Sequence, residues 1–175
     1  WLRLYNLGET MSFTYDQGRD LLVLAEMASG NLRLIGPTTG IGGLFLGPLL
    51  YYFLLPGFIL THGSPIGVAV WNAFLITLTL PLFYVVLRPL VGKKLAWVGL
   101  GLLMITPGAL EQARLIWNPS LTVPTLLISY AALFASKQKP WLLGLSLFAF
   151  GLSLQTELAY TVFLSLLYGV WILAY

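Results

Sequence analysis

A cluster of ionisable side chains lies near the start of the chain. If residues 16–29 form one helix, turning about 100° per residue, Asp16, Arg19, Asp20 and Glu26 fall within an arc of about 120°. Carboxylates in such a cluster can accept a proton from a hydroxyl group. The same pattern also describes a solvated linker helix that performs no chemistry.

The other side of this predicted helix is apolar. It carries Leu21, Leu22, Leu24, Ala25 and Ala28. A helix with one charged and one apolar face is typical of a segment that lies flat on a membrane, with its charges toward water. Asp16 opens the helix, so a second interpretation makes it only an N-cap, a position that aspartate favours.

The composition indicates an integral membrane protein. The chain has 175 residues, of which 58% are hydrophobic and 9% are charged, whereas soluble domains carry roughly 25% charged residues. It has no cysteine and one histidine, His62, which leaves no disulfide framework and no thiolate or histidine-rich metal site. The net charge of +3 is too small and scattered to indicate a nucleic-acid partner.

Five apolar runs are predicted to span the membrane, at about 65–88, 95–111, 119–136, 141–155 and 158–175. Basic residues cluster in the loops at 88–94 and 137–139, which two predicted spans separate. These loops therefore share a side, which the positive-inside tendency makes cytoplasmic. The loops at 111–118 and 155–157 are then extracytoplasmic.

The run 44–60 is ambiguous. It is 17 residues long, and Gly47-Pro48 and Pro56-Gly57 interrupt it. If it spans, eight of the nine Lys and Arg residues lie on the cytoplasmic side; if it does not, five do. Charge counting favours a span. The prolines and the marginal length favour a broken or re-entrant helix at the membrane surface.

Four patches in order carry a resemblance to a known family. They are Tyr15–Asp20 (YDQGRD), Leu34–Thr39 (LIGPTT), Phe45–Tyr52 (FLGPLLYY) and Arg114–Pro119 (RLIWNP). In sequence and spacing they resemble the membrane glycosyltransferases of the GT-C fold. The closest group is the bacterial family-39 type, akin to dolichyl-phosphate-mannose protein mannosyltransferases and aminoarabinose transferases. The resemblance covers residues 1 to about 160.

The resemblance implies an all-α, polytopic transmembrane bundle. Residues 1–64 would form its first extracytoplasmic loop, with helices lying along the membrane at about 16–29 and 46–60, which favours a 44–60 segment that does not span. A first span before Trp1 and a C-terminal part are expected to be missing, so that this chain is an N-terminal fragment. The implied location is the cell membrane, with the active site on the extracytoplasmic side.

The implied reaction transfers a hexosyl or pentosyl group from a polyprenyl-phosphate donor to a lipid, glycan or protein hydroxyl. Asp16 stands where the family has its catalytic carboxylate. Family members often have Asp-Glu at this point; here Gln17 follows Asp16, which argues against a paired-carboxylate or metal role for that position. No cofactor is expected, and a divalent metal is not indicated. The partners expected are the lipid-linked donor and membrane lipids.

Five further residues are candidates for substrate binding: Asp20, Arg19, Arg114, Asn118 and Glu157. Each has a structural alternative. Asp20 could simply pair with Arg19 or Arg114, Arg114 could pair with Glu111 three residues earlier, and Asn118 could cap the next helix. Glu157 lies between two apolar runs, where an ionisable group is costly unless it faces water or a partner.

Two other classes of protein fit parts of the pattern. A membrane transporter or lipid flippase would explain an apolar segment broken by proline and glycine, but no inverted repeat is visible. A non-catalytic membrane scaffold would also tolerate an acidic amphipathic helix.

Overall fold

The computed structural model describes residues 1–39, 41–158, 165, 166, 168–170 and 173. Within these residues the chain forms nine helices and no strand, apart from an isolated bridge between Thr38 and Phe45, which confirms the all-α prediction. The helices are α1 (Leu7–Thr10), α2 (Tyr15–Ala28), α3 (Leu49–Leu60), α4 (Pro65–Val91), α5 (Lys93–Ile105), α6 (Pro107–Arg114), η1 (Asn118–Leu121), α7 (Thr122–Ser136) and α8 (Leu142–Leu154).

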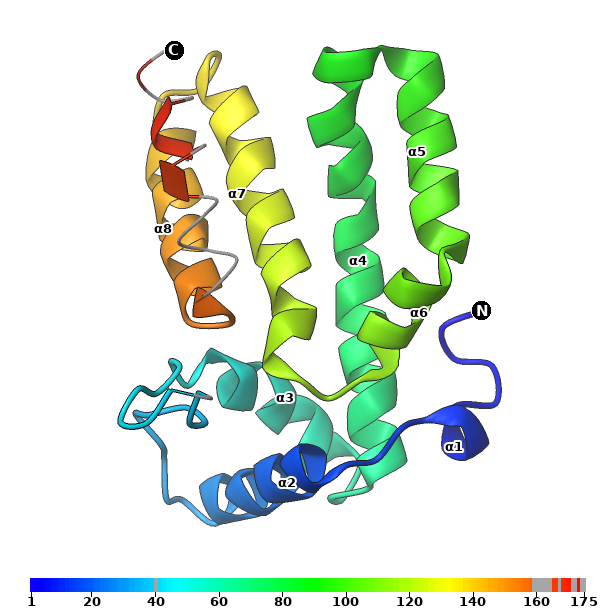
Figure 1. The fold of residues 1–175 in the computed structure, drawn as a ribbon, viewed down its shortest axis with the longest axis vertical. Coiled ribbons are helices and arrows are strands. Elements are labelled where there is room, and N and C mark those ends of the chain that lie inside the picture. The colour runs from blue at the N-terminus through cyan, green and yellow to red at the C-terminus, as the bar shows by residue number, and fades with distance from the viewer. Residues whose placement is uncertain (40, 159–164, 167, 171–172, 174–175) are drawn as a thin grey trace.

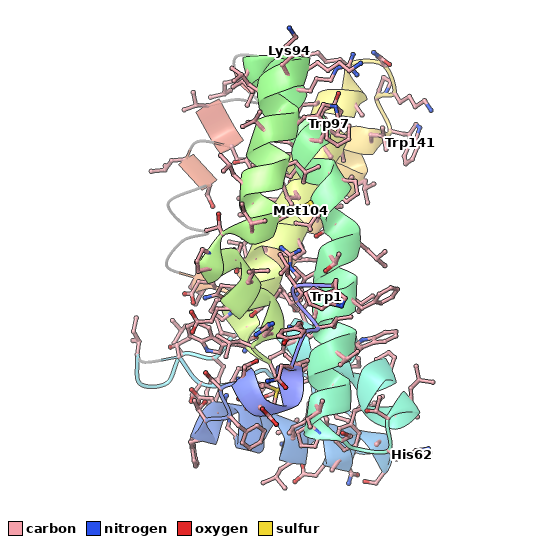
Figure 2. The ribbon with its side chains drawn as sticks, turned by 90° about the vertical axis from the view of Figure 1, so that its right-hand side faces the viewer. Trp1, His62, Lys94, Trp97, Met104 and Trp141 are labelled. Carbon is pink, nitrogen blue, oxygen red and sulfur yellow. The ribbon has the colours of Figure 1, made fainter. Side chains whose placement is uncertain are left out.

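Two helical hairpins stand side by side, and α2 and α3 lie across one end of them (Figure 1). Helices α4 and α5 form one antiparallel hairpin, and α7 and α8 form the other. Lys94 and Trp141 lie near one end of the molecule, and His62 lies at the opposite end (Figure 2). The two basic loops therefore share an end, and the crosswise helices occupy the other.

Two helices are long and apolar enough to cross a membrane, and a bent pair adds a third if it counts as one span. Helix α4 has 27 residues, and the continuous 118–136 segment has 19. At 1.5 Å per residue, α4 is about 40 Å long, more than the roughly 30 Å of a bilayer's hydrocarbon core. These helices are consistent with an integral membrane protein.

The predicted span 95–111 is not one straight helix. Helices α5 and α6 meet at an angle of 58°. Pro107 is the first residue of α6, and Thr106 before it is extended, with φ −61° and ψ 125°. Proline disfavours helical geometry in the preceding residue, which explains the break. Pro107 lies inside the predicted span 95–111, so the prediction of one continuous helix there is wrong.

The predicted span 141–155 corresponds to the short helix α8. Helix α8 has 13 residues and is therefore about 20 Å long, shorter than a membrane-crossing helix requires. The predicted span 158–175 lies largely outside the described residues.

A buried core joins the crosswise helices to α4. It contains Leu24 and Met27 of α2, Leu50 and Leu54 of α3, and Val68 of α4. Helix α3 begins at Leu49 because Pro48 is its N-cap, and it continues through Pro56 without a break. The indole N–H of Trp71 donates a hydrogen bond to the Phe53 carbonyl across 2.9 Å, which further ties α3 to α4. Helix α3 is among the apolar helices too short to qualify as a candidate span.

The predicted charged face of α2 does not lie wholly toward water, because Asp20 is buried, and the predicted apolar face is buried only in part. The buried residues of the helix are Gln17, Asp20, Leu24 and Met27. Leu22 is 70% exposed, although it was assigned to the apolar face. The reason is tertiary: α3 supplies a polar partner for Asp20, so the helix turns that carboxylate inward. The helix ends at Ala28, one residue before the predicted bound; Ser29 is its C-cap, and Gly30 follows with φ 104°.

We predict that Gly57 is required for the contact between α3 and α4. A Cβ atom at this position would lie 2.3 Å from Cγ of Trp71, so Gly57→Ala forces the two helices apart. Overpacking of this kind typically costs about 1–3 kcal/mol, which would appear as a lower thermal midpoint in detergent. Gly101→Ala is the matched control, because a Cβ atom there meets nothing within 4 Å. Equal midpoints for the two variants would contradict the prediction.

Candidate functional site

The arginine of α2 joins the two aspartates of the same helix. The Arg19 Nη1 group donates to Oδ1 of Asp16 at 2.8 Å. The Nε and Nη2 groups of Arg19 donate to Oδ1 of Asp20 at 3.0 and 2.9 Å. Asp20 therefore pairs with Arg19 rather than Arg114, one of the alternatives that the sequence left open. The charged groups hold each other in fixed positions along the first turns of α2.

Helix α3 completes this network. The Tyr51 hydroxyl donates to Oδ1 of Asp20 at 3.2 Å. Asp20 is fully buried, and its Oδ2 atom has no hydrogen-bond partner among the described residues. The side chain of Asp16, in contrast, is 51% exposed. The two carboxylates therefore have different environments, and only Asp16 is accessible to a ligand.

Burial dominates the protonation of Asp20. It raises the pKa of the carboxyl above the ordinary 3.8, against the opposing effects of Arg19 and the Tyr51 hydroxyl. Burial also acts to lower the pKa of Arg19, but Asp20 and Asp16 outweigh it and the net shift is upward. The Asp20 carboxyl is almost completely buried, whereas the Arg19 guanidinium stays partly exposed. Desolvation therefore sets the direction of the pKa shift for Asp20 but not for Arg19. Burial and the charge of Asp20 raise the pKa of Tyr51 to about 12.

Asp16 is not the N-cap of α2. Thr14 holds that position, and its backbone N–H donates to Oε1 of Gln17 at 3.1 Å. Gln17 is the third residue of the helix, where a glutamine side chain satisfies the exposed amide of the cap. Gln17 therefore has a structural role, because it caps the start of α2. The capping alternative for Asp16 is excluded.

A polar hollow of about 240 Å³ opens beside Asp16. Its walls come from the start of α2, the 37–46 loop, the 117–119 segment and Glu157, three residues after the end of α8. The lining residues are Asp16, Arg19, Pro37, Thr38, Thr39, Leu46, Trp117, Asn118, Pro119 and Glu157. The structure thus brings together four of the residues predicted from sequence: Asp16, Arg19, Asn118 and Glu157. Asp20 lies beneath them, in contact with Arg19.

The 117–119 segment is positioned by a buried asparagine of α4. The Asn72 Nδ2 group donates to the carbonyls of Ala113 and Leu115, at 3.0 and 2.8 Å. These carbonyls lie at the end of α6, where a helix leaves acceptors without internal partners. Asn118 follows in η1 and is buried, and its Oδ1 atom has no partner among the described residues. Asn118 therefore borders the hollow with a buried side chain.

Arg114 lies elsewhere. Its Nη2 group donates to the carbonyls of Leu2 and Tyr5, and its Nη1 group donates to the Thr10 hydroxyl. It forms no salt bridge with Glu111, although both line a separate hollow of about 380 Å³. In this structure Arg114 anchors the N-terminal segment against α6, and it does not join the cluster around Asp16.

A larger and mostly apolar cavity, of about 700 Å³, adjoins the polar hollow. The two spaces share Trp117, Pro119 and Glu157 as lining residues. The apolar cavity lies between α4, α6 and α7, whose residues supply most of its walls. The site therefore offers charged and hydrogen-bonding groups next to a hydrocarbon-like space, which suits an amphiphilic ligand.

Sequence reasoning missed three residues of this region. Tyr51 and Trp117 were given no individual role within their patches, and Arg3, which lines the apolar cavity, was not singled out. Tyr51 and Trp117 lie inside two of the quoted patches, and that position was the signal available from the sequence. Within the described residues, no group of three His, Cys, Asp or Glu side chains is arranged to hold a metal.

Comparison of this chain with protein-family models, with curated proteins and with solved structures found no significant match.

We predict that Asp20 makes the stability of the protein depend on pH. Because its pKa is raised on folding, the folded protein binds this proton more tightly than the unfolded chain. The contribution of protonated Asp20 to the free energy of unfolding is fully present below pH 3.8. It is lost as the pH rises through the pKa of Asp20 in the folded protein. The unfolding midpoint of Asp20→Asn should therefore fall less between pH 4 and pH 8 than that of the wild-type protein.

Glu111→Gln provides the control, because it removes an exposed carboxylate outside this network. It should retain the decline seen in the wild-type protein. An Asp20→Asn profile that follows the wild type would show that the buried carboxyl does not titrate in this range.

Proposed function

We propose that this protein is a membrane glycosyltransferase that transfers a sugar from a polyprenyl-phosphate donor to an acceptor hydroxyl. The observation that carries the proposal is the adjacency of the polar hollow and the apolar cavity, which share Trp117, Pro119 and Glu157. A donor of this class has a polar sugar phosphate joined to a hydrocarbon chain, and these two spaces match its two parts. The ordered sequence patches that resemble the GT-C family contribute residues to the same hollow.

Asp16 is the proposed general base. It is the accessible carboxylate of the network, and Arg19 holds it in place through the 2.8 Å ion pair. In the proposed reaction the acceptor oxygen attacks the anomeric carbon, its proton passes to Asp16, and the lipid phosphate leaves. Asp20 is unsuited to this role because it is fully buried. We assign it the positioning of Arg19.

The remaining lining residues would bind the sugar. Asn118 has a buried carbonyl oxygen with no partner among the described residues, which suits a sugar hydroxyl. Thr38 and Thr39 add hydroxyl groups, and Glu157 adds a carboxylate on the opposite wall. We infer that this polar hollow selects the transferred sugar.

The proposed orientation places α2 and α3 on the extracytoplasmic side. The basic loops at 88–94 and 137–139 share the opposite end of the hairpins (Figures 1 and 2). The positive-inside tendency assigns that end to the cytoplasm. In this arrangement α2 and α3 form part of the first extracytoplasmic loop of a polytopic GT-C type bundle.

A transporter or lipid flippase is the second candidate. The bend of 58° between α5 and α6 favours it, because broken helices often expose backbone at a transport site. Residues of α6 line the apolar cavity. Such a protein would move the lipid across the membrane without any sugar transfer, so the transfer assay below separates the two functions.

We predict that Asp16→Asn abolishes transfer with little effect on folding. Asparagine preserves the size of the side chain but cannot take the proton, a loss typically worth about 10²–10⁴ in rate. The measurement is turnover by the purified full-length protein with a polyprenyl-phosphate sugar donor. Glu26→Gln is the matched control, since Glu26 is an exposed acid of the same helix that pairs with Arg33. Wild-type turnover in Asp16→Asn would place the base elsewhere.

We also predict that Asn31 and Lys94 lie on opposite sides of the membrane. Both residues are exposed, and this chain contains no cysteine of its own. Single cysteines at the two positions should react with an impermeant thiol reagent from opposite faces of intact cells and inverted vesicles. Labelling of both from the same face would refute the proposed orientation.

A further inference from the structure

Arg3 has a buried positive charge that no described residue neutralises. It is 6% exposed, and its Nε atom has no hydrogen-bond partner among the residues that the structure describes. The salt bridges found among the described residues involve other arginines. Its backbone is fixed nonetheless, because its carbonyl accepts a hydrogen bond from Nε of Arg114 at 3.3 Å. The side chain is therefore held at a site where its charge lacks a counter-ion.

The side chain borders the apolar cavity of about 700 Å³. Most of the surrounding wall is hydrocarbon, including Ile76, Leu80, Leu103, Val123 and Leu126. Among the described lining residues, Glu157 is the other ionisable group, and it also belongs to the polar hollow. A guanidinium group and an apolar space thus lie next to the proposed sugar site.

An arginine in such surroundings favours an anionic partner. Burial lowers the pKa of Arg3, yet a guanidinium retains its proton at physiological pH. A buried charge without a partner is costly. The planar fork of an arginine matches the oxygens of a phosphate, and the hydrogen bonds formed are strengthened by charge.

The other two arginines near the site are already occupied. Arg19 lies between the carboxylates of Asp16 and Asp20. Arg114 directs its nitrogens at the N-terminal segment. Within the described part of the chain, Arg3 is the arginine of this region whose side chain retains donors for a ligand.

We propose that Arg3 binds the phosphate of a lipid phosphate monoester whose hydrocarbon chain occupies the apolar cavity. The proposal rests on the proposed function, in which this monoester is the lipid phosphate that leaves when the sugar is transferred. It adds a phosphate-binding residue that lies outside the four sequence patches. The lipid would then reach the polar hollow along the shared wall at Trp117 and Glu157.

Binding of farnesyl phosphate to the purified full-length protein, measured by titration calorimetry in maltoside micelles, tests the proposal. Farnesyl phosphate should bind at least tenfold more tightly than farnesol, which has the chain without the phosphate. Inorganic phosphate, which has the charge without the chain, should bind at least tenfold more weakly as well. Equal affinity for farnesyl phosphate and farnesol would overturn the proposal, and so would equal affinity for farnesyl phosphate and inorganic phosphate.

Substitution of Arg3 assigns the effect to its side chain. Arg3→Gln should weaken farnesyl phosphate binding by about 10–100-fold, the range expected for charge-assisted hydrogen bonds, and leave farnesol binding unchanged. Arg3→Lys should retain part of the affinity because it keeps the charge. Arg33→Gln is the control, since Arg33 is an exposed arginine paired with Glu26. Wild-type affinity for farnesyl phosphate in Arg3→Gln would refute the assignment.

A second variant and a comparison with transferase activity complete the test. If Arg3→Gln does not fold, Gly108→Leu should reduce the affinity for farnesyl phosphate by filling the cavity. Gly108 lines this cavity, and a Cβ atom there meets nothing within 4 Å. Because these probes carry no sugar, binding is independent of transfer. Farnesyl phosphate binding that depends on Arg3, in a protein without transferase activity, would support the phosphate site and refute the proposed function.

Discussion

The burial of the Asp20 carboxylate between α2 and α3 is the interaction on which the arrangement of the site depends. A buried carboxylate is tolerated only where donors surround it. Arg19 and Tyr51 supply those donors, so α2 must sit with this face against α3. The same arginine reaches Asp16 and holds the accessible carboxylate at the edge of the hollow. One electrostatic requirement thus sets both the packing of the helix and the position of the proposed base.

The opposite wall of the hollow depends on a second buried polar contact. Asn72 of α4 donates two hydrogen bonds to the carbonyls of Ala113 and Leu115, at the end of α6. This contact fixes the chain just before Trp117 and Asn118, at the end of the molecule where α2 and α3 lie across the hairpins (Figure 1). Polar side chains inside an otherwise hydrocarbon protein therefore determine the geometry of the site, because each has few possible partners in such surroundings.

The region combines a polar surface and an apolar surface side by side. The polar hollow carries carboxylates, an arginine and an amide, and the adjoining cavity is walled mainly by aliphatic side chains. Arg3 lies on the apolar side of this boundary, where its charge has no described counter-ion. A ligand that satisfied these groups would place an anion near Arg3, hydrocarbon along the cavity and a hydrogen-bond donor near Asn118.

The sequence by itself predicted the all-α fold, the approximate bounds of most helices and the presence of helices long and apolar enough to cross a membrane. These follow from apolar runs, proline and glycine positions and basic loops, which act locally along the chain. It also predicted four of the residues that meet in the polar hollow, since their motifs mark chemistry even before their contacts are known.

Only the tertiary structure decided which face of α2 is buried, because amphipathicity cannot show that α3 provides a partner for an inward carboxylate. It likewise separated Arg114, which anchors the N-terminal segment, from the hollow, and it placed Arg3 at the apolar cavity. Each of these outcomes depends on contacts between residues far apart in sequence, such as Arg114 with Leu2 or Asp20 with Tyr51. Spacing along one helix carries no information on such partners, which arise only when the helices pack.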